Sequence, residues 1–194
     1  MTETGIVILA AGNSSRLGRP KQLLPYRDRT LLTHITTAAL AASLTPVVVI
    51  TGAFRKEIED SLQGQAIEIV FNPDWEKGMA SGIVAGLSKL VSLHPATDAV
   101  IVAVCDQPYI SAELFRVLVD SHTRTGKGLI ACAYSGTIGT PVLFGRQYFS
   151  SLSALSGDEG AKKLLKRYPE DIVTIPFPQG DIDIDTQSDY DKVV

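Results

Sequence analysis

The fold of this chain is decided by residues 5–21, which read GIVILAAGNSSRLGRPK. The run from residue 5 to residue 11 is continuously apolar with a β-branched centre, and it breaks at Gly12 and the polar residues after it. Continuous apolar runs of this length are typical of strands that are buried on both faces of a parallel sheet. The stretch therefore predicts a first buried strand that enters a glycine-containing loop.

Outward from this stretch, strand-like and helix-like segments alternate. Residues 30–42 place their apolar side chains on one helical stripe, and the β-branched run 47–50 follows Pro46. The next expected elements are helices at 55–62, 81–93 and 113–122 and strands at 67–71, 99–104 and 129–134. Such alternation predicts an α/β fold, a Rossmann-like three-layer sandwich in which helices cover both faces of a mostly parallel sheet.

Beyond residue 134 the alternation becomes less regular. A strand is expected at 141–144, a helix around 159–167 and a strand at 172–175, before a tail that begins at Asp181. The composition does not change along this stretch. We therefore expect a single domain over residues 1–194, in which about residues 135–180 form an elaboration that binds a second substrate.

Composition and charge restrict the partners. The 194 residues, 45% hydrophobic and 20% charged, are enough for one α/β domain with a sizeable core. The formal net charge of −3 argues against a broad surface for nucleic acid. The apolar runs are too short for a membrane helix, and the first residues carry no targeting segment. We expect a cytoplasmic protein with neither nucleic acid nor a membrane as its partner.

The loop after the first strand combines glycines and small side chains with the cations Arg16 and Lys21. Backbone N–H groups in such a turn bind phosphate oxygens, while the cations neutralise the phosphate charge. The sequence Gly18-Arg19-Pro20 lacks the Gly-Lys-Ser/Thr of a P-loop, and the loop has no G-x-G-x-x-G. The loop therefore predicts a triphosphate site and argues against kinases and dehydrogenases. The plainer alternative is a turn with solvated cations.

Asp106 comes just after the strand expected to end at Val104. Ligands of parallel sheets bind at the carboxyl ends of the strands, and a carboxylate there can hold Mg²⁺ against substrate phosphates. The alternative is that Asp106 caps the next helix. Because Ser111 can provide that cap, we favour the metal role for Asp106.

Residues 181–185 alternate strictly between aspartate and isoleucine. A strand there would bury both isoleucines and project three carboxylates from the other face, where they repel unless a cation lies among them. Asp185 is the expected second metal ligand, with Asp183 beside it. A solvated acidic edge strand is the alternative, and Thr186 is expected to cap the last helix.

The segment from Asn72 to Gly82 is a further candidate for ligand contact. Asn72 follows a strand and can hydrogen-bond a ribose or a base, and Gly78 and Gly82 permit close approach. A turn before a helix would use the same residue types. Trp75 is an isolated aromatic residue, so we expect it to pack against protein and not to stack on a ligand.

The loop resembles the motif L-A-A-G-x-S-x-R-M-G-x-P-K of the molybdenum cofactor cytidylyltransferase family, a branch of the MobA-like NTP transferases, with Leu17 where methionine is usual. The similarity continues through residues 22–24 (QLL) and through later segments in the same order. These segments are 72–79 (NPDWEKGM), 105–108 (CDQP), 139–144 (GTPVLF), 157–161 (GDEGA) and 183–186 (DIDT). The resemblance thus covers nearly the whole chain.

This resemblance implies a fold, a reaction and site residues. The fold is that of the nucleotide-diphospho-sugar transferases, and the reaction is Mg²⁺-dependent transfer of CMP from CTP to molybdopterin cofactor with release of pyrophosphate. The implied catalytic residues are Arg16, Lys21 and Asp106, and the implied metal ligands are Asp106 and Asp185. The implied nucleotide-binding residues are Leu9, Ala10, Ala11, Gly12, Arg16, Lys21, Asn72, Ser81, Gly82 and Asp106. The implied second-substrate residues are Gly139, Pro141, Asp158 and Asp183.

Other interpretations stay open. Transferases that act on sugar or polyol phosphates resemble this fold but have a longer spacer between the loop's Arg and Lys. Relatives that use GTP have Gly-Gly where Ala11-Gly12 stands, which favours CTP. A third alternative is a protein of molybdoenzyme maturation that binds nucleotide or cofactor without catalysis. The cations Arg16 and Lys21 together with the carboxylates Asp106 and Asp185 argue against it, since binding alone would not need the carboxylate pair. A molybdoenzyme that receives the product is one candidate partner.

The second-substrate positions are the least defined by sequence. Thr140 lies where the family often has histidine. The stretch of residues 157–160 also suits the start of an N-capped helix, and in the functional alternative Asp158 faces the second substrate. The sequence therefore leaves the identity of the acceptor open.

Overall fold

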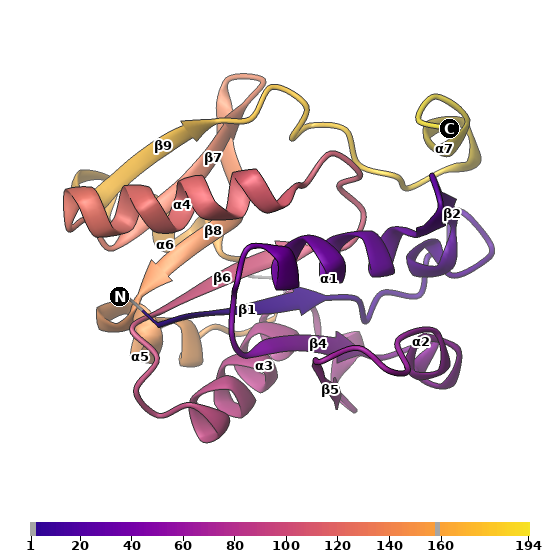
Figure 1. The fold of residues 1–194 in the computed structure, drawn as a ribbon, viewed down its shortest axis with the longest axis horizontal. Coiled ribbons are helices and arrows are strands. Elements are labelled where there is room, and N and C mark those ends of the chain that lie inside the picture. The colour runs from indigo at the N-terminus through magenta and orange to yellow at the C-terminus, as the bar shows by residue number, and fades with distance from the viewer. Residues whose placement is uncertain (1–2, 158–159) are drawn as a thin grey trace.

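The central element of the fold is a seven-stranded sheet (Figure 1). The structure is a computed structural model that describes residues 3–157 and 160–194. In spatial order the strands are β5 (Glu68–Phe71), β4 (Val47–Thr51), β1 (Thr4–Leu9), β6 (Ala99–Val104), β8 (Thr137–Gly145), β7 (Leu129–Tyr134) and β9 (Ile172–Pro176). All neighbouring pairs are parallel except those that β8 makes with β6 and β7. The predicted mostly parallel α/β sheet is confirmed.

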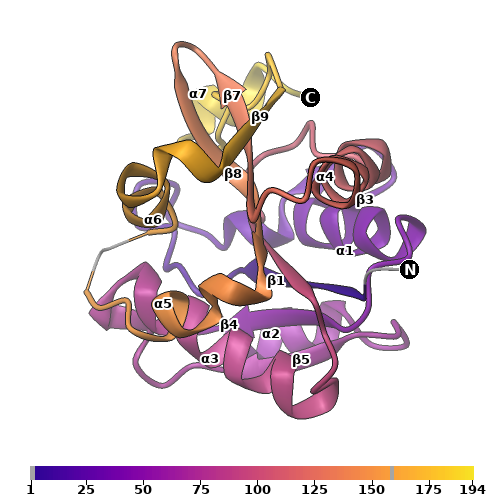
Figure 2. The same cartoon turned by 90° about the vertical axis from the view of Figure 1, so that its left-hand side faces the viewer.

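Helices cover both faces of this sheet and complete the three predicted layers. One face carries α1 (Leu31–Ala41), α2 (Arg55–Ser61) and α4 (Ala112–Thr125), and the other carries α3 (Met79–Leu93), α5 (Phe149–Ser153) and α6 (Lys162–Arg167). Successive side chains of β1 point to opposite faces of the sheet. Ile6 and Ile8 pack in the core under α1, α2 and α4, and Val7 packs in the core under α3, α5 and α6. Figure 2 shows α1 and α4 on one side of the strands and α5 and α6 on the other.

Two helices begin directly after residues whose side chains cap their first turn. The hydroxyl of Ser111 accepts a hydrogen bond from Leu114 N at 3.2 Å, so the cap of α4 does not involve Asp106. Thr186 caps α7 (Gln187–Asp191) in a reciprocal capping box with Asp189. Both caps were expected from the sequence, and both are confirmed.

The tail at residues 181–185 is not a strand, which corrects the sequence prediction. Ile184 N donates a hydrogen bond to Asp106 O at 3.0 Å, but the segment forms no ladder with a neighbouring strand. Ile184 is fully buried against Leu24 and Leu31 in a small third core, whereas Ile182 is only half-buried. One anchored isoleucine, and not strand pairing, therefore holds this segment beside the end of β6.

Two further boundaries differ from those expected from sequence. The strand expected at 141–144 is the middle of the longer β8, because β7 and β8 form a hairpin whose turn residues Ser135 and Gly136 both have positive φ. The helix expected around 159–167 is described from Lys162 onward as α6. Within the described residues, no helix meets the length and hydropathy needed to cross a bilayer.

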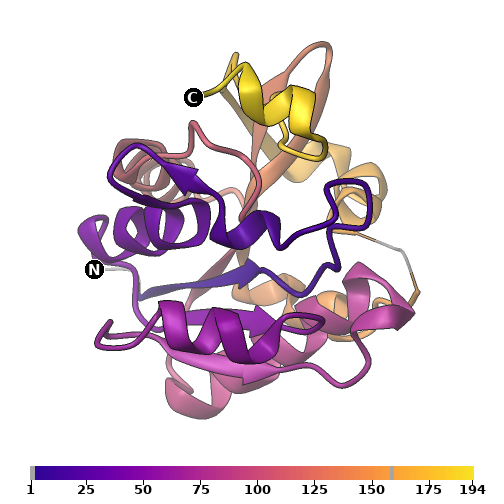
Figure 3. The same ribbon diagram turned by 90° about the vertical axis from the view of Figure 1, so that its right-hand side faces the viewer.

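The C-terminal segment lies beside the first loop. Arg19 Nη2 donates to Gln187 Oε1 at 2.8 Å, and Tyr190 Oη donates to Pro25 O at 2.7 Å. Pro25 belongs to a short antiparallel ribbon of β2 (Pro25–Tyr26) and β3 (Arg29–Thr30). Figure 3 shows α7 and this ribbon at the end of the molecule toward which β1 runs. The tail's aspartates are thereby brought to the carboxyl edge of the sheet.

Candidate active site

A cavity of about 240 Å³ opens at the carboxyl edge of β1 and β6. It is lined by Leu9, Ala10, Ala11, Gly12, Lys21, Gln22, Asn72, Trp75, Gly78, Met79, Gly82, Val104, Cys105 and Asp106. The structure therefore brings together most of the residues that the sequence proposed for nucleotide binding. Arg16 and Ser81 lie outside the lining, where Arg16 pairs with a carboxylate and Ser81 supports a turn.

Lys21 joins two carboxylates from distant parts of the chain. Its Nζ donates to Asp106 Oδ2 at 2.5 Å and to Asp185 Oδ1 at 2.8 Å. Arg16 Nη2 donates to the other oxygen of Asp185 at 2.6 Å. The Lys21 and Asp106 side chains are only 15% and 18% exposed, whereas Arg16 is 67% exposed. The two carboxylates that the sequence proposed as metal ligands thus meet at one buried ammonium group.

The charges of this cluster stabilise one another. Burial alone would lower the pKa of Lys21, but the carboxylates of Asp106 and Asp185 raise it above its usual value. Burial alone would raise the pKa of Asp185, but hydrogen bonding and charge from Lys21 and Arg16 lower it. Lys21 and Asp185 are therefore both charged at neutral pH.

Asp183 completes the group. Burial of its carboxyl group and repulsion by Asp106 and Asp185 raise the pKa of Asp183 to about 6. Three carboxylates thus face the two cations Arg16 and Lys21. The cluster has an excess of negative charge before any phosphate arrives.

Asp106 and Asp185 are suited to a divalent cation shared with phosphate. Asp106 Oδ1 is buried and has no hydrogen-bond partner among the described residues. No group of three or more His, Cys, Asp or Glu side chains forms a metal cage in the described parts of the chain. Mg²⁺, however, is usually held by one or two carboxylates together with substrate phosphates. The free oxygen and the negative excess therefore fit Mg²⁺ that arrives with a nucleotide.

Gln22 holds the loop in place, a role that the sequence analysis missed. Its side chain is buried, and its Nε2 donates to Ala10 O at 2.8 Å and to Gly12 O at 2.9 Å. The Ser14 hydroxyl accepts a hydrogen bond from Lys21 N at 3.1 Å. These bonds fix the loop backbone beside the cavity. The only signal in the sequence is a polar residue next to the apolar pair 23–24.

Replacing Gln22 with leucine should lower the free energy of unfolding by about 1–3 kcal/mol, because two loop carbonyls lose their buried donor. Urea denaturation of both proteins measures the difference. Gln63→Leu is the control, since Gln63 is exposed and, among the described residues, hydrogen-bonds only to Asp60 at 3.3 Å. An equal loss in both variants would contradict the bracing role of Gln22.

Asn72 is held by protein groups even though it lines the cavity. Its Nδ2 donates to Ser81 Oγ at 2.8 Å, and its Oδ1 accepts from Asp74 N at 3.0 Å. The Ser81 hydroxyl also donates to Gly78 O at 2.8 Å. Ser81 therefore shapes the turn and positions Asn72. This role corrects the assignment of Ser81 to direct nucleotide contact.

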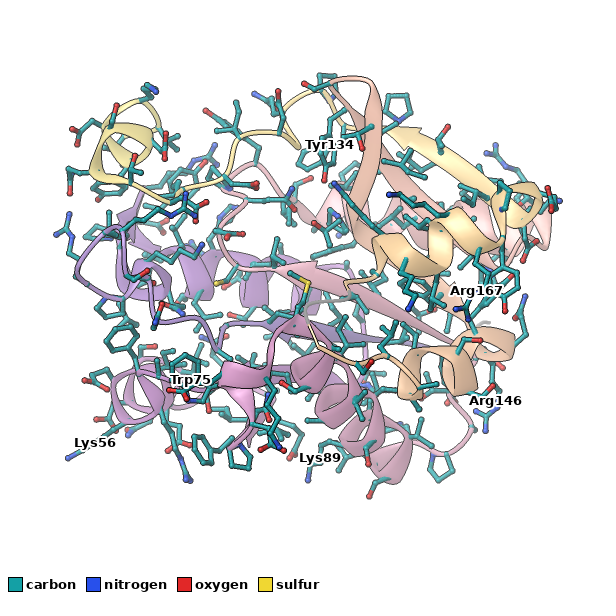
Figure 4. The ribbon with its side chains drawn as sticks, turned by 180° about the vertical axis from the view of Figure 1, so that it is seen from behind. Lys56, Trp75, Lys89, Tyr134, Arg146 and Arg167 are labelled. Atoms are coloured by element: carbon teal, nitrogen blue, oxygen red, sulfur yellow. The ribbon has the colours of Figure 1, made fainter. Side chains whose placement is uncertain are left out.

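Trp75, labelled in Figure 4, packs against protein as expected and also lines the cavity. A Cβ on Gly52, the residue after β4, would lie 2.8 Å from Trp75 Cγ and 2.6 Å from Ala11 O. Only glycine fits at position 52 without displacing the backbone carbonyl of Ala11. The sequence analysis missed Gly52, and it assigned no site role to Met79 and Cys105 although both lie in the family-like segments 72–79 and 105–108.

The proposed second-substrate residues fall into three groups. Asp183 is exposed and lies near the Lys21 cluster. Gly139 lies beneath two side chains, Tyr134 and Lys162, and Pro141 is buried within β8, so its side chain is not available to a ligand. This burial corrects the assignment of Pro141. Asp158 lies outside the described residues.

Comparison with known proteins places these features in a family. Residues 6–172 match the model of the MobA-like NTP transferase domain. Nicotine blue oxidoreductase of Paenarthrobacter nicotinovorans is 34% identical over 173 residues, which cover 84% of this chain and 81% of that protein.

Solved structures give the same result. Rv0371c of Mycobacterium tuberculosis H37Rv has 29% identity and a TM-score of 0.86, over 99% of this chain and 97% of that one. Its complex with manganese has 26% identity and a TM-score of 0.79, over 99% and 98% of the two chains. The similarity extends over the whole sheet and both helical layers.

Proposed function

Since the chain belongs to the MobA-like NTP transferase family, we propose that it is a magnesium-dependent cytidylyltransferase, which transfers CMP from CTP to molybdopterin cofactor and releases pyrophosphate. The observation that carries the proposal is the Lys21 ammonium held between Asp106 and Asp185 at the mouth of the cavity. A cation and two carboxylates beside a loop of small residues are the groups that nucleotidyl transfer needs.

The reaction is a displacement at the α-phosphorus of the nucleotide. A terminal phosphate oxygen of the acceptor forms the new bond to this phosphorus, the bond to the bridging oxygen breaks, and pyrophosphate leaves with the electron pair. A phosphate nucleophile is already anionic, so no general base is required. Lys21 and Arg16 stabilise the charge that gathers on the leaving pyrophosphate.

The charge balance supports a metal requirement. A triphosphate that enters beside Asp106, Asp183 and Asp185 meets a site that already has excess negative charge. Asp106 and Asp185 would hold Mg²⁺, which supplies Lewis-acid stabilisation of the phosphate oxygens. The manganese complex of Rv0371c, a relative with 26% identity, is consistent with a divalent ion in this family. Lys21, which the carboxylates hold at the cavity, is then placed to bind phosphate.

The loop sequence supports a cytosine base. Ala11-Gly12 stands where the relatives that use GTP have Gly-Gly, and both residues line the cavity. CTP is therefore the nucleotide that we propose.

A redox activity is the second candidate. The observation that favours it is the name of the relative with 34% identity, nicotine blue oxidoreductase. Such an activity would consume a reduced nicotinamide nucleotide in the presence of an electron acceptor, whereas nucleotidyl transfer releases pyrophosphate. The two candidates therefore differ in their products.

Pyrophosphate release from CTP, GTP, ATP and UTP with Mg²⁺, each with and without molybdopterin, is the decisive experiment. We expect release with CTP only when molybdopterin is present. Release with a different acceptor or nucleotide would keep the transferase but overturn its proposed substrates. Nucleotide binding without release would indicate a carrier, and oxidation of NADH or NADPH with a quinonoid dye would indicate the redox alternative.

A further inference from the structure

A cation beyond Arg16 and Lys21 is supplied by a different part of the fold. Lys162 begins α6, and its side chain passes over Gly139 of β8, where a Cβ would lie 3.0 Å from Lys162 Cε. The same Cβ would overlap with the hydroxyl of Tyr134, the last residue of β7. A glycine at position 139 therefore lets an ammonium side chain and a phenol hydroxyl meet over one point of the sheet.

Tyr134, labelled in Figure 4, is held in place by residues packed against its ring. A Cβ on Gly180 would overlap with the Tyr134 ring, and Phe177 meets the ring edge-on at 6.4 Å between centroids. Thr140 and Gln107 lie next to the hydroxyl, and burial raises the pKa of Tyr134. The hydroxyl is thus protonated at neutral pH and is a hydrogen-bond donor in a fixed place.

The Lys162 side chain extends from the first residue of α6 to the part of β8 around Gly139, so this cation does not belong to the nucleotide loop. The Lys162 ammonium has no hydrogen bond or ion pair with another described residue. A cation near the reacting groups, with its donors unused by the described protein, is available to an anionic ligand.

The segment before α6 also borders the nucleotide cavity. Ala80 N donates to Gly157 O at 3.2 Å, and a Cβ on Gly160 would lie 3.1 Å from Met79 Sδ, which lines the cavity. α6 therefore starts directly at the rim of the cavity. In-line transfer needs the attacking group on the side of the α-phosphorus opposite to the leaving pyrophosphate. Arg16 and Lys21 come from the loop after β1, whereas Lys162 comes from α6, so Lys162 is a cation from another element that can hold the attacking group.

We propose that Lys162 and Tyr134 bind the phosphomonoester of the acceptor and present its oxygen to the α-phosphorus. The Lys162 ammonium supplies charge and the Tyr134 hydroxyl supplies a directed hydrogen bond. This inference rests on the proposed nucleotidyl transfer but does not depend on which molecule carries the phosphate. It assigns acceptor binding to the β7–β8 hairpin and α6, outside the loop motif.

The test uses the full chain saturated with Mg²⁺ and α,β-methylene-CTP, a nucleotide that is not cleaved at the α-phosphorus. Inorganic phosphate is titrated into this complex and followed by ³¹P NMR. Lys162→Met should weaken phosphate binding by about tenfold or more, the effect of losing a charged hydrogen bond. Tyr134→Phe, which keeps the ring packing, should weaken phosphate binding several-fold. Lys166→Met is the control, because Lys166 is exposed on the same helix.

Kinetics with molybdopterin provide the second readout. Lys162→Met should raise the KM for molybdopterin and leave the KM for CTP unchanged, a split that a merely structural role would not produce. Phosphate binding that is the same in wild type and Lys162→Met would overturn the inference while leaving the proposed function intact. Failure of the wild-type protein to bind the CTP analogue would instead overturn the proposed function, and this inference with it.

Discussion

Lys21→Met should lower turnover by about 10²- to 10³-fold at saturating CTP, because a preorganised charge on the leaving pyrophosphate is lost. In the structure, Lys21 is 15% exposed and held by two carboxylates, so its ammonium is fixed before substrate arrives. Preorganisation of this kind costs no rearrangement of solvent during the reaction. Pyrophosphate release under single-turnover conditions measures the effect on the chemical step.

A matched control separates this effect from a general loss of charge. Lys56 lies exposed on α2, labelled in Figure 4, and Lys56→Met should leave turnover unchanged. Lys21→Met also leaves Asp106 and Asp185 facing each other without their shared cation. Its affinity for Mg²⁺ should therefore rise, which titration of the ion against unfolding temperature can detect. Near-normal turnover of Lys21→Met would show that the assignment of Lys21 is wrong.

The parts of the fold that sequence predicts well are those governed by local pattern. The buried run that became β1, the strands β4 and β6, and the caps at Ser111 and Thr186 depend on neighbouring residues only. The place of the charged loop follows equally directly, because parallel strands bring their carboxyl ends to one edge. These features needed no knowledge of distant contacts.

The features that sequence missed depend on contacts between distant segments. The alternating tail resembles a strand, but its position is set by burial of Ile184 in a small core formed by the first loop region and α1. Gln22 gives no local sign that its amide bridges two loop carbonyls. Gly52 is required by the Trp75 ring and the Ala11 carbonyl, which approach from other elements. No periodicity along the chain encodes such approaches.

Interpretation of single aromatic residues was limited for the same reason. Trp75 and Tyr134 both stand apart from any aromatic motif, and the more frequent role for such residues is packing. In the fold, each lies over a glycine next to charged or small residues at the carboxyl edge. Each ring is therefore positioned by a glycine that is distant in sequence. The sequence around the aromatic residue alone gives no sign of this pairing.

Asp106→Asn should lower turnover by about 10²- to 10³-fold, the scale seen when one preorganised electrostatic group is removed from an active site. The same change should alter the free energy of unfolding by less than about 1 kcal/mol, because asparagine keeps an oxygen for Lys21 and relieves part of the repulsion among three carboxylates. Turnover and urea denaturation are measured on one preparation. Loss of the charge should also raise the Mg²⁺ concentration that gives half-maximal turnover.

Asp171→Asn is the control, because we expect it to change the free energy of unfolding and not the turnover. Asp171 accepts hydrogen bonds from Tyr148 Oη at 2.7 Å and Gly128 N at 3.1 Å, at the end of the sheet away from the cavity. Its substitution should reduce stability and leave turnover unchanged. A residue retained for catalysis tolerates a buried polar atom without a partner that a structural residue does not, and Asp106 Oδ1 has no hydrogen-bond partner among the described residues. If Asp106→Asn lost stability and turnover in parallel, as a structural residue would, the proposed role of Asp106 in holding the metal would be wrong.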